Sequence, residues 1–556
     1  MPEKFSPEEK QILSPFFTNL DQDVFCLKLP QEVAGALFSR YSRSSKGLRQ
    51  VFLEEFVGQF GAGLPTSQSE IADDQDAASL KKAREFYDRV LVGYGDDSVA
   101  QLGGAHIACE NISNVAANLI EDSRIGIAPL EKSTRYVRFD KKDANGNYLI
   151  FKEPRIMASR YAEEYLRVMH LMFETYASQL DPMIEFVSKK LPISEMDFKH
   201  PKTGEPLSFR EFQKDEGLAK WAETAYRSTV RAQACDILRG YLPASTKTNV
   251  GLFGVGQAFE HLLTKLYSNP LQEARALAAA IHRELNRLIP SFVKRARASV
   301  YLTETQDAIR LAFRQTLADI PVEKAEAVTM VDYDREAEEK ILAAMLYPHA
   351  GHTLGQLRRI VRAMTPSERE KLLLESISRR KTRRDKPGRA LEQVYYTFDI
   401  LGNLGLYRDL HRHRILTRER QDFTVAHGYD TPVEIIEAGY QGDFDRMMQE
   451  AAGLYEKTER DLPQEAQYIV PFAYRVRWYM KLNLREAVHI GELRTMPQGH
   501  PDYRIIVQKM WRKIQEVHPT LAAFAQFIDW KTYRLGRLQS EMWTEFKRSK
   551  LKKDGD

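Results

Sequence analysis

The order of apolar and polar residues predicts a chain made mostly of helices, with a few short strands. Apolar residues recur at helical spacing through residues 271–297, which predicts one long helix there. Residues 298–325 have the pattern of a connecting helix and linker. Aromatic and β-branched residues dominate 394–398 and 476–480, and a short run of the same kind covers 328–332. We expect strands at these three places.

Two helix starts carry the residues of a capping box. Ser6 and Thr365 are each followed by a proline and, at the third position, by a glutamate, Glu9 or Glu368. The hydroxyl and the carboxylate of such a pair each accept a hydrogen bond from a backbone N–H of the first turn. Because helices outnumber strands, the expected fold class is α+β, with an antiparallel sheet flanked by helices.

The composition is that of a folded globular protein. Of 556 residues, 43% are hydrophobic and 28% are charged, which supplies a core and argues against disorder. The net charge of +4 is close to balance, so we expect no general nucleic-acid partner. Three widely spaced cysteines give neither a disulfide framework nor a metal spacing. No run approaches about 18 consecutive apolar residues and the first residues are polar, so we expect a cytoplasmic protein without a membrane partner.

The densest chemical signal is the triplet Arg412-His413-Arg414. A second cluster follows about 70 residues later, with Asn483, Arg485, His489 and Arg494 at offsets of two, six and eleven residues. If that segment is helical, Asn483 and Arg494 lie near one face, about three turns apart. Guanidinium groups bind phosphate in a forked geometry, so the two clusters suit a large anionic ligand with a polar ring system. A solvated basic helix face is the alternative interpretation of the triplet.

These motifs resemble the flavin-dependent thymidylate synthase family. Its signature is Arg-His-Arg followed, further on, by leucine-proline, an aromatic strand, Asn-x-Arg, a helix and another arginine. Residues 469–485 keep this order, with Val470-Pro471 before the strand. Upstream, Glu392 precedes the triplet by the family's spacing, although Gln393 stands where the family has histidine.

A weak internal repeat accounts for a length about twice that of family members. Residues 87–136 resemble the same family segment, with the triplet reduced to Asp122-Ser123-Arg124 and the substrate loop kept as Glu131-Lys-Ser133-Thr-Arg135-Tyr136. Leu238-Arg239-Gly-Tyr-Leu242-Pro243 matches a second family motif. The resemblance therefore implies two tandem copies, 1–325 and 326–556, each an antiparallel sheet flanked by helices.

The two copies have lost complementary motifs. The first copy keeps positions that hold the nucleotide in the family, and the second keeps the flavin-side positions. One composite site could follow, since family sites are built from several subunits. A changed substrate and a loss of catalysis, with the scaffold reused for binding a partner or nucleic acid, are the alternatives. The resemblance also implies a homodimer, in which four copies form a pseudo-tetramer.

The resemblance implies reductive methylation of dUMP to dTMP, with FAD as cofactor and NADPH and methylenetetrahydrofolate as co-substrates. A different uracil-containing substrate is the alternative. Arg494 and Ser133 are the implied catalytic residues. The implied flavin-binding residues are Glu392, Arg412, His413, Arg414, Asn483, Arg485 and His489. The implied substrate-binding residues are Glu131, Ser133, Arg135, Arg239 and Arg494.

Three further patterns are better explained by ordinary structure. The basic run 379–384 is read as a solvated loop, with a role in guiding anionic substrates as the alternative. His411, His427, His500 and His518 do not form a zinc pattern, so no metal site is expected. The run 254–256 lacks the third glycine of a dinucleotide fingerprint.

Overall fold

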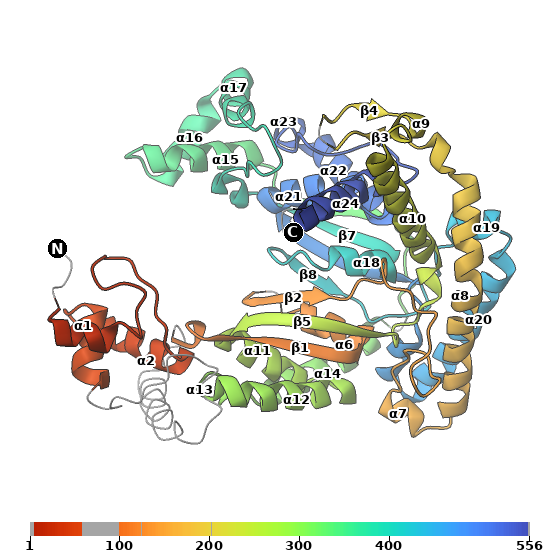
Figure 1. Cartoon of the computed structure of the whole chain (residues 1–556), viewed down its shortest axis with the longest axis horizontal. Coiled ribbons are helices and arrows are strands. Elements are labelled where there is room, and N and C mark those ends of the chain that lie inside the picture. The colour runs from red at the N-terminus through yellow and green to blue at the C-terminus, as the bar shows by residue number, and fades with distance from the viewer. Residues whose placement is uncertain (1–4, 58–98, 124, 202, 318, 554–556) are drawn as a thin grey trace. The chain divides into compact units, whose positions relative to one another are not determined.

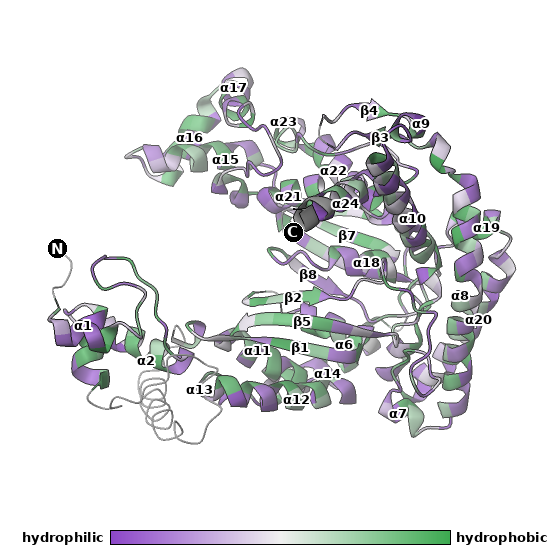
Figure 2. Ribbon diagram, in the orientation of Figure 1, coloured by the Kyte–Doolittle hydropathy of each residue, from purple (hydrophilic) through white to green (hydrophobic). Residues whose placement is uncertain are grey.

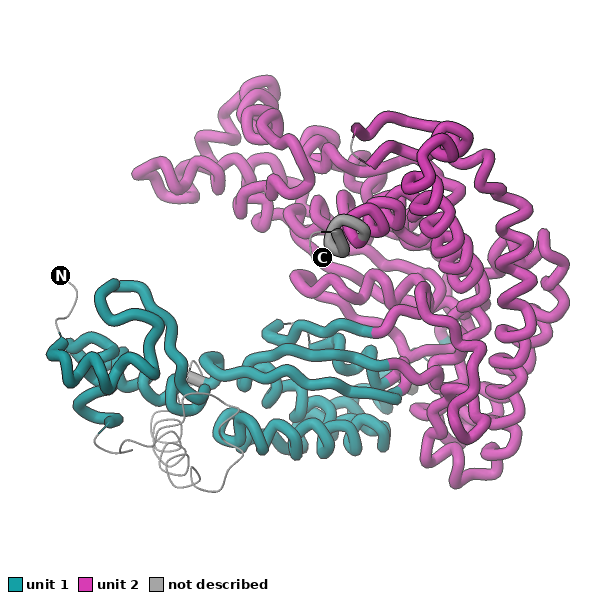
Figure 3. The backbone as a smooth tube through the Cα atoms, in the orientation of Figure 1, with its two compact units in different colours: residues 1–112, 116–131, 249–319 teal, residues 113–115, 132–248, 320–556 magenta. Residues whose placement is uncertain are grey.

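The protein divides into two compact units, coloured separately in Figure 3. The computed structural model describes residues 5–57, 99–123, 125–201, 203–317 and 319–553. Unit 1 contains 1–112, 116–131 and 249–319, and unit 2 contains 113–115, 132–248 and 320–556. Within the described ranges, no helix is both long enough and apolar enough to cross a membrane.

Unit 1 holds most of a three-stranded sheet of order β1-β5-β2. Strand β2 (Ile127–Glu131) pairs antiparallel with β5 (Lys247–Val255), from Ile127 opposite Gly254 to Glu131 opposite Val250. The third strand is β1 (Gly104–Ser113). The strands are mostly hydrophobic (Figure 2), and Figure 1 shows helices against one face of the sheet. The helices of this unit are α1 (Pro7–Leu13), α2 (Gln31–Tyr41), α3 (Leu48–Val51), most of α6 (Asn114–Glu121), α11 (Gly256–Tyr267), α12 (Gln272–Leu288), α13 (Pro290–Val293) and α14 (Val300–Leu317), with the shorter η1 (Phe52–Val57) and η5 (Val99–Gln101).

The single long helix predicted over 271–297 is wrong, because the structure breaks it. Helix α12 ends at Leu288, Ile289 has φ −138° and ψ 51°, and α13 begins at Pro290. A residue before proline is pushed out of the helical region by the proline ring, so the apolar spacing continues while the backbone does not. The expected connecting helix in 298–325 is confirmed as α14.

Unit 2 contains a four-stranded sheet of order β6-β7-β9-β8 in which every neighbouring pair is antiparallel. Its centre is β7 (Tyr395–Asn403) against β9 (Arg475–Asn483), and β6 (Val328–Tyr333) and β8 (Thr417–Arg420) form the edges. All three strands predicted from sequence are therefore confirmed. Trp478 is 1% exposed in this sheet and anchors the core.

Long helices of unit 2 pack against one another beside this sheet (Figure 1). Helix α8 (Ala162–Lys190) contacts both α10 (Glu216–Leu238) and α20 (Gln441–Asp461). The buried side of α8 includes Tyr165, Phe173 and Tyr176. The other elements of unit 2 are α7 (Pro154–Met157), η6 (Ile193–Glu195), β3 (Phe198–Lys199), β4 (Pro206–Leu207), α9 (Phe209–Phe212), η7 (Arg239–Tyr241), α15 (Ala337–Leu346), η8 (Tyr347–His349), α16 (Leu354–Ala363), α17 (Pro366–Ile377), η9 (Arg389–Gln393), α18 (Leu404–Leu410), α19 (Val433–Glu437), η10 (Glu465–Ile469), α21 (Leu484–Arg494), α22 (Pro501–Val517), α23 (Pro519–Ala522) and α24 (Leu538–Lys553).

Equivalent segments of the two sequence repeats meet each other inside unit 2. Pro243 and Pro471, the prolines of the repeated Pro motif, form an antiparallel bridge. The backbone N–H of Ala244 donates to Val470 O at 2.8 Å, and that of Phe472 donates to Leu242 O at 2.9 Å. The exchange is reciprocal, as expected when two copies of one fold pair around a local twofold axis.

The helix break in unit 1 recurs in unit 2. Helix α22 ends at Val517, His518 has φ −139° and ψ 69°, and α23 begins at Pro519. With both capping boxes also confirmed, the fold is α+β and contains two tandem divergent copies. The predicted boundary at 325/326 divides the two sequence repeats. The compact units are divided differently, because residues 132–248 of the first repeat belong to the same unit as residues 320–556. The boundary therefore stays a prediction about the repeats.

Candidate functional site

The Arg-His-Arg triplet follows a short buried helix of unit 2. The side chain of Asn403, at the end of β7, accepts a hydrogen bond from Leu406 N at 2.8 Å and starts α18. The helix ends at Leu410 with His411 as its C-cap, after which Arg412 is exposed, His413 is 5% exposed and Arg414 is half-buried. Within the described residues, the Arg412 side chain makes no hydrogen bond or ion pair. It is a cation open to a ligand.

The second cluster lies on a helix that starts in the same way. Asn483 ends β9 and caps α21, accepting from Glu486 N at 2.9 Å. The next predicted residue, Arg485, donates from Nη1 to Glu392 Oε1 and from Nε to Pro387 O, both at 2.9 Å. Thus Glu392 and Arg485, 93 residues apart, are joined by an ion pair.

The two clusters meet at His413. Its Nδ1 lies 3.0 Å from Glu486 Oε1, and its Nε2 accepts a hydrogen bond from Arg494 Nε at 2.8 Å. The ring centroids of His413 and His489 are 5.7 Å apart. Lys386 Nζ lies 2.9 Å from His489 Nδ1. The structure therefore brings together His413, His489 and Arg494, as the sequence predicted, and adds Glu486 and Lys386.

Burial controls the charges of this group. Burial, together with Arg494, lowers the pKa of His413 well below its usual value. Burial and then Lys386 lower the pKa of His489 to about 4. Burial raises the pKa of Glu486 to about 7, and the nearby cations only partly offset it. At neutral pH both imidazoles are uncharged, and Glu486 is close to its titration point.

Among the described residues, His413, Glu486 and His489 have the spacing of a metal-binding group, with ligand atoms within 4.8 Å of one another. The sequence did not predict it, because His413 lies 73 residues before Glu486, although Glu486 and His489 are three residues apart on α21. Arg494 already donates to one nitrogen of His413, and Lys386 lies at hydrogen-bond distance from one nitrogen of His489. Both neighbours are cations that would repel a metal ion, so we assign the group to hydrogen bonding.

Substrate residues predicted from the first copy lie close to residues of the second. The guanidinium of Arg135 is 5.9 Å from the centre of the Tyr503 ring, and that of Arg494 is 5.7 Å from the same ring. Ser133 Oγ accepts a hydrogen bond from Arg135 N at 3.3 Å. Arg239 Nη1 donates to Asp409, which lies two residues before His411, at 3.2 Å. All of these residues belong to unit 2.

Other predicted residues lie outside this convergence or outside the described chain. Glu131 is in β2 of unit 1, opposite Val250, and is 7% exposed. Arg124 and the segment 87–98, which carried part of the repeat signal, lie outside the described residues. The roles assigned to all of these positions stay predictions.

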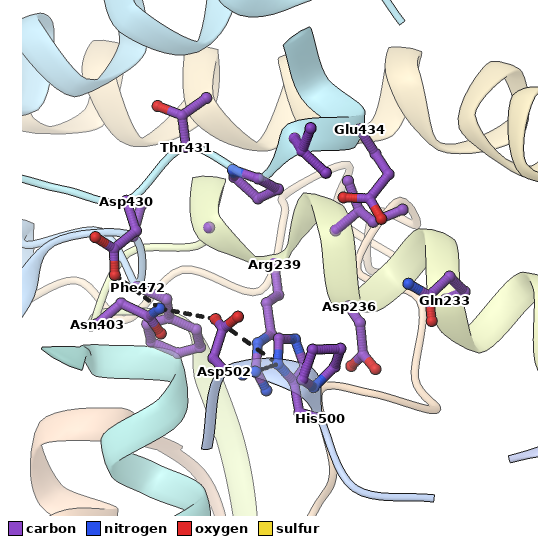
Figure 4. A pocket seen from close by; sticks show the side chains of 16 residues that line it. Gln233, Asp236, Arg239, Asn403, Asp430, Thr431, Glu434, Phe472, His500 and Asp502 are labelled. Carbon is purple, nitrogen blue, oxygen red and sulfur yellow. Dashed lines mark hydrogen bonds and ion pairs between the residues drawn. The ribbon is translucent and has the colours of Figure 1, made fainter. Parts of the chain in front are cut away.

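A cavity of about 330 Å³ in unit 2 adjoins Arg239 (Figure 4). Helix α10, the residues before α19 and the start of α22 contribute to its wall. Asn403 Nδ2 donates to Asp430 at 3.1 Å and to Asp502 at 2.9 Å, which holds two carboxylates at the cavity. Burial and then Arg239 lower the pKa of His500, on the same wall, to about 4.

Sequence reasoning did not identify the acidic partners of the predicted arginines. Arg135 Nε lies 3.0 Å from Asp236, and Arg537 Nη2 donates to the same carboxylate at 2.7 Å. Asp409 is the corresponding partner of Arg239. A signal for both aspartates was present: Asp236 lies three residues before Arg239, and Asp409 three residues before Arg412.

The residues around His489 fit an anionic cofactor such as FAD. Lys386, Arg494 and Arg383 all act on His489 strongly enough to lower its pKa. Arg412 adds an exposed cation that makes no hydrogen bond or ion pair within the described residues, although its charge helps to lower the pKa of Asp409. Several neighbouring cations suit a pyrophosphate and the polar edge of a flavin ring.

Comparison with known proteins identifies a family. The sequence matches the family described as Thymidylate synthase complementing protein over residues 57–291 and 329–520. It is 39% identical over 557 residues to a UPF0159 protein of Chlamydia pneumoniae, covering 98% of each chain. It is 38% identical over 518 residues to a UPF0159 protein of Thermoplasma acidophilum, covering 91% of this chain and 97% of the relative.

More distant similarities involve named enzymes. A flavin-dependent thymidylate synthase of Sulfolobus acidocaldarius is 29% identical over 144 residues, or 24% of this chain and 55% of that protein. Among solved structures, the UMP/dUMP methylase PolB from Streptomyces cacaoi, bound with 5-Br dUMP, is 17% identical with a TM-score of 0.29. The similarity covers 37% of this chain and 98% of that one.

Proposed function

Because the chain belongs to the thymidylate synthase complementing protein family, we propose that it is a flavin-dependent enzyme that methylates a uracil ring reductively at C5. The proposed cofactor is FAD, and the proposed co-substrates are NADPH and methylenetetrahydrofolate. The nucleotide dUMP is the substrate implied by the family, with another uracil-containing compound as the alternative. The product from dUMP would be dTMP.

The observation that carries this proposal is the position of Arg494. This arginine lies between the flavin-side residues, through its hydrogen bond to His413, and the substrate-side residues, through the Tyr503 ring that Arg135 also faces. A ring held there would have a cation beside its carbonyl edge. Cationic donors favour the negative charge that develops when C5 becomes nucleophilic.

His413 acts by orienting Arg494. Neutral His413 keeps its proton on Nδ1, which donates to Glu486, and this leaves Nε2 to accept from Arg494. An imidazole fixed in this tautomer holds the guanidinium in one direction. Catalysis by positioned groups depends on such orientation, since misplacement by about 1 Å can cost about 10²-fold in rate.

Arg412, Arg414, Asn483, Arg485 and Glu392 are the proposed flavin-binding residues, with His413 and His489 against the ring. A bound flavin supplies the hydride, which no side chain can supply. The chain supplies cations for the phosphates and neutral imidazoles for the ring. Neutral histidines are the form expected from the lowered pKa values of both rings.

The test is an assay of the purified full chain after reconstitution with FAD. Dithionite-reduced or NADPH-reduced protein, methylenetetrahydrofolate and dUMP or 2′-deoxyuridine should give a C5-methylated product, detected by mass. A protein that binds no flavin and forms no product from either substrate contradicts the proposal and favours a non-catalytic relative that reuses the scaffold.

A further inference from the structure

Residues 379–389 of unit 2 form a basic loop that is tied to helix α21 by a buried ion pair. Arg380 donates from Nη1 to Glu492 Oε1 at 2.9 Å and from Nη2 to Glu492 Oε2 at 2.8 Å. The two side chains are 5% and 3% exposed. A forked pair fixes direction as well as distance, and breaking it would leave a buried charge unpaired. The basic run 379–384 is therefore only partly solvated, and the loop is attached to the helix that carries His489.

The backbone of the basic loop is folded around Asp385. One oxygen of this carboxylate accepts hydrogen bonds from Thr382 N at 2.7 Å and Lys381 N at 2.9 Å, which lower the pKa of Asp385 below its ordinary value. Arg380 Nε donates to the carbonyl oxygen of the same residue at 2.7 Å. Backbone N–H groups that cluster in a turn are donors with which many proteins bind phosphate. Here the loop's own carboxylate already takes two of them, so an incoming anion would meet side chains instead.

The side chains of the basic loop carry an excess of positive charge. Seven of its eleven residues are lysine or arginine, and Asp385 is its one acidic residue. Carboxylate partners lie near Arg379, Arg380 and Arg389. Within the described part of the chain, the cations without a carboxylate at ion-pair distance are Lys381, Arg383, Arg384 and Lys386. All of these except Arg383 are exposed. Neighbouring like charges repel, so an anion bound among them would be stabilised.

A cavity of about 250 Å³ in unit 2 adjoins the basic loop. Its apolar wall includes Met345, Leu391 and Phe524, and the cations Arg379 and Lys386 also line it. An apolar space with a few polar groups is typical of a site for a small ligand. This combination suits an aromatic group that is joined to carboxylates.

The same loop reaches the residues proposed to face the flavin. Lys386 Nζ lies 2.9 Å from His489 Nδ1. Burial and Lys386 lower the pKa of His489 most, and Arg383 of the same loop adds to this effect. A folate consists of a pterin, an aromatic aminobenzoyl group and then one or more glutamates joined through their γ-carboxyls. A pterin that delivers its carbon beside the flavin extends the rest of the molecule away from it, and the basic loop leads from His489 to solvent.

We propose that the basic loop and the adjoining cavity bind the aminobenzoyl group and the γ-linked glutamate tail of the folate co-substrate. The carboxylates of the tail lie against Lys381, Arg384 and Lys386. Cations spread along a loop suit carboxylates spaced along a chain, whereas a phosphate group needs donors that converge on one point. This inference rests on the proposed function and names how its co-substrate is held.

The first test compares two folates by calorimetry, using the purified full chain loaded with FAD. Tetrahydrofolate with a pentaglutamate tail should bind at least about tenfold more tightly than tetrahydrofolate with a single glutamate. The advantage should shrink as salt is added, because exposed charges make the contacts. Equal affinities at low salt overturn the inference and leave the proposed function standing. Binding of neither folate overturns both.

The double variant Lys381→Gln with Arg384→Gln tests the contribution of the loop. Its preference for the pentaglutamate should fall to about threefold or less, while its affinity for FAD stays that of the natural chain. The matched control is Lys509→Gln with Arg512→Gln, which also removes an exposed lysine and an exposed arginine three residues apart, on α22. The control should keep the full preference. An unchanged preference in the loop variant, or a loss of FAD affinity in its place, overturns the inference.

Thermal unfolding with the tail alone gives a readout that depends on neither flavin nor uracil. A γ-linked pentaglutamate peptide should raise the melting temperature of the natural chain more than that of the loop variant. Equal increases in the two proteins contradict the inference. Inorganic phosphate and NADPH at the same concentration are the comparison anions. If either raises the melting temperature of the natural chain as much as the peptide does, and loses this effect in the loop variant, the loop is a phosphate site and the inference is overturned.

Discussion

Three hydrogen-bonded side chains, Glu486, His413 and Arg494, join the first turn of α21 to its last residue. Burial keeps the imidazole neutral and leaves the carboxyl near its titration point. The arrangement fixes the Arg494 guanidinium through a neutral imidazole, while the Asp409 carboxylate also acts on it electrostatically. The charge state of Glu486 should therefore affect how the free energy of unfolding depends on pH.

Glu486→Gln should change how stability depends on pH. Burial raises the pKa of Glu486 from 4.5 to about 7, so its contribution is fully present below pH 4.5 and is lost as pH rises through about 7. The glutamine side chain does not ionise, so the variant should gain about 3 kcal/mol relative to the natural chain across this range. Denaturant unfolding at several pH values measures the difference. A difference that is constant with pH would falsify the assigned burial effect.

Replacing Arg412 and Arg414 together with Ala should remove the flavin. Each charge-assisted contact is worth about 1.5–3 kcal/mol, so FAD binding should weaken at least about tenfold. The control is Arg359→Ala, an exposed arginine of α16. Flavin fluorescence titration of the three proteins measures the affinities, and an unchanged affinity in the double variant refutes the placement of the cofactor.

At the scale of secondary structure, both helices that carry the site begin at an asparagine that ends a central strand. Asn403 ends β7 and caps α18, and Asn483 ends β9 and caps α21. The two strands are paired with Asn483 opposite Tyr395 and Asn403 opposite Arg475. The caps thus start the two helices from opposite ends of one antiparallel pair.

Asn483→Ala should therefore reduce stability as well as flavin binding. Loss of an N-cap side chain costs about 1 kcal/mol, within a range of about 0.5–2 kcal/mol. Asn483→Asp should keep the cap, because a carboxylate also accepts from Glu486 N and is favoured at a helix N-terminus. Equal losses of unfolding free energy in both variants, measured by denaturant titration, would speak against a capping role.

Local patterns predicted the strands and caps well, because each depends on residues close in sequence. The break at Ile289 was missed, although Pro290 was visible, since apolar spacing continued through it. The ion pairs were beyond local patterns: Arg135 and Asp236 are 101 residues apart, and Arg239 and Asp409 are 170 apart. The second pair joins the two copies and forms only when they fold together, whereas Arg135 and Asp236 are distant residues of the first copy.

At the scale of the whole molecule, the chain contains two divergent copies whose repeated prolines, Pro243 and Pro471, pair with each other. Arg135 and Ser133 from the first copy and Arg494 from the second lie in one compact unit. A single chain therefore already brings Arg135 of the first copy and Arg494 of the second to the same ring, that of Tyr503. With residues of both copies in one unit, each copy can lose the motif that the other keeps.

We expect the chain to form a homodimer. Twofold association is the commonest closed arrangement, and two chains would give four copies of the family domain. Multi-angle light scattering should give twice the chain mass of 64.1 kDa at concentrations where flavin is bound. A stable species of 64.1 kDa with full flavin occupancy is the contrary result.

The most direct test of the proposed chemistry follows a labelled methylene carbon. The full chain, loaded with FAD, is incubated with NADPH, carbon-labelled methylenetetrahydrofolate and either 2′-deoxyuridine or dUMP, and the pyrimidine products are analysed by mass spectrometry. The predicted result is label in a C5 methyl group of the pyrimidine product, and loss of that product in Arg494→Ala. Flavin-loaded protein that transfers no label to either compound contradicts a uracil-methylating function.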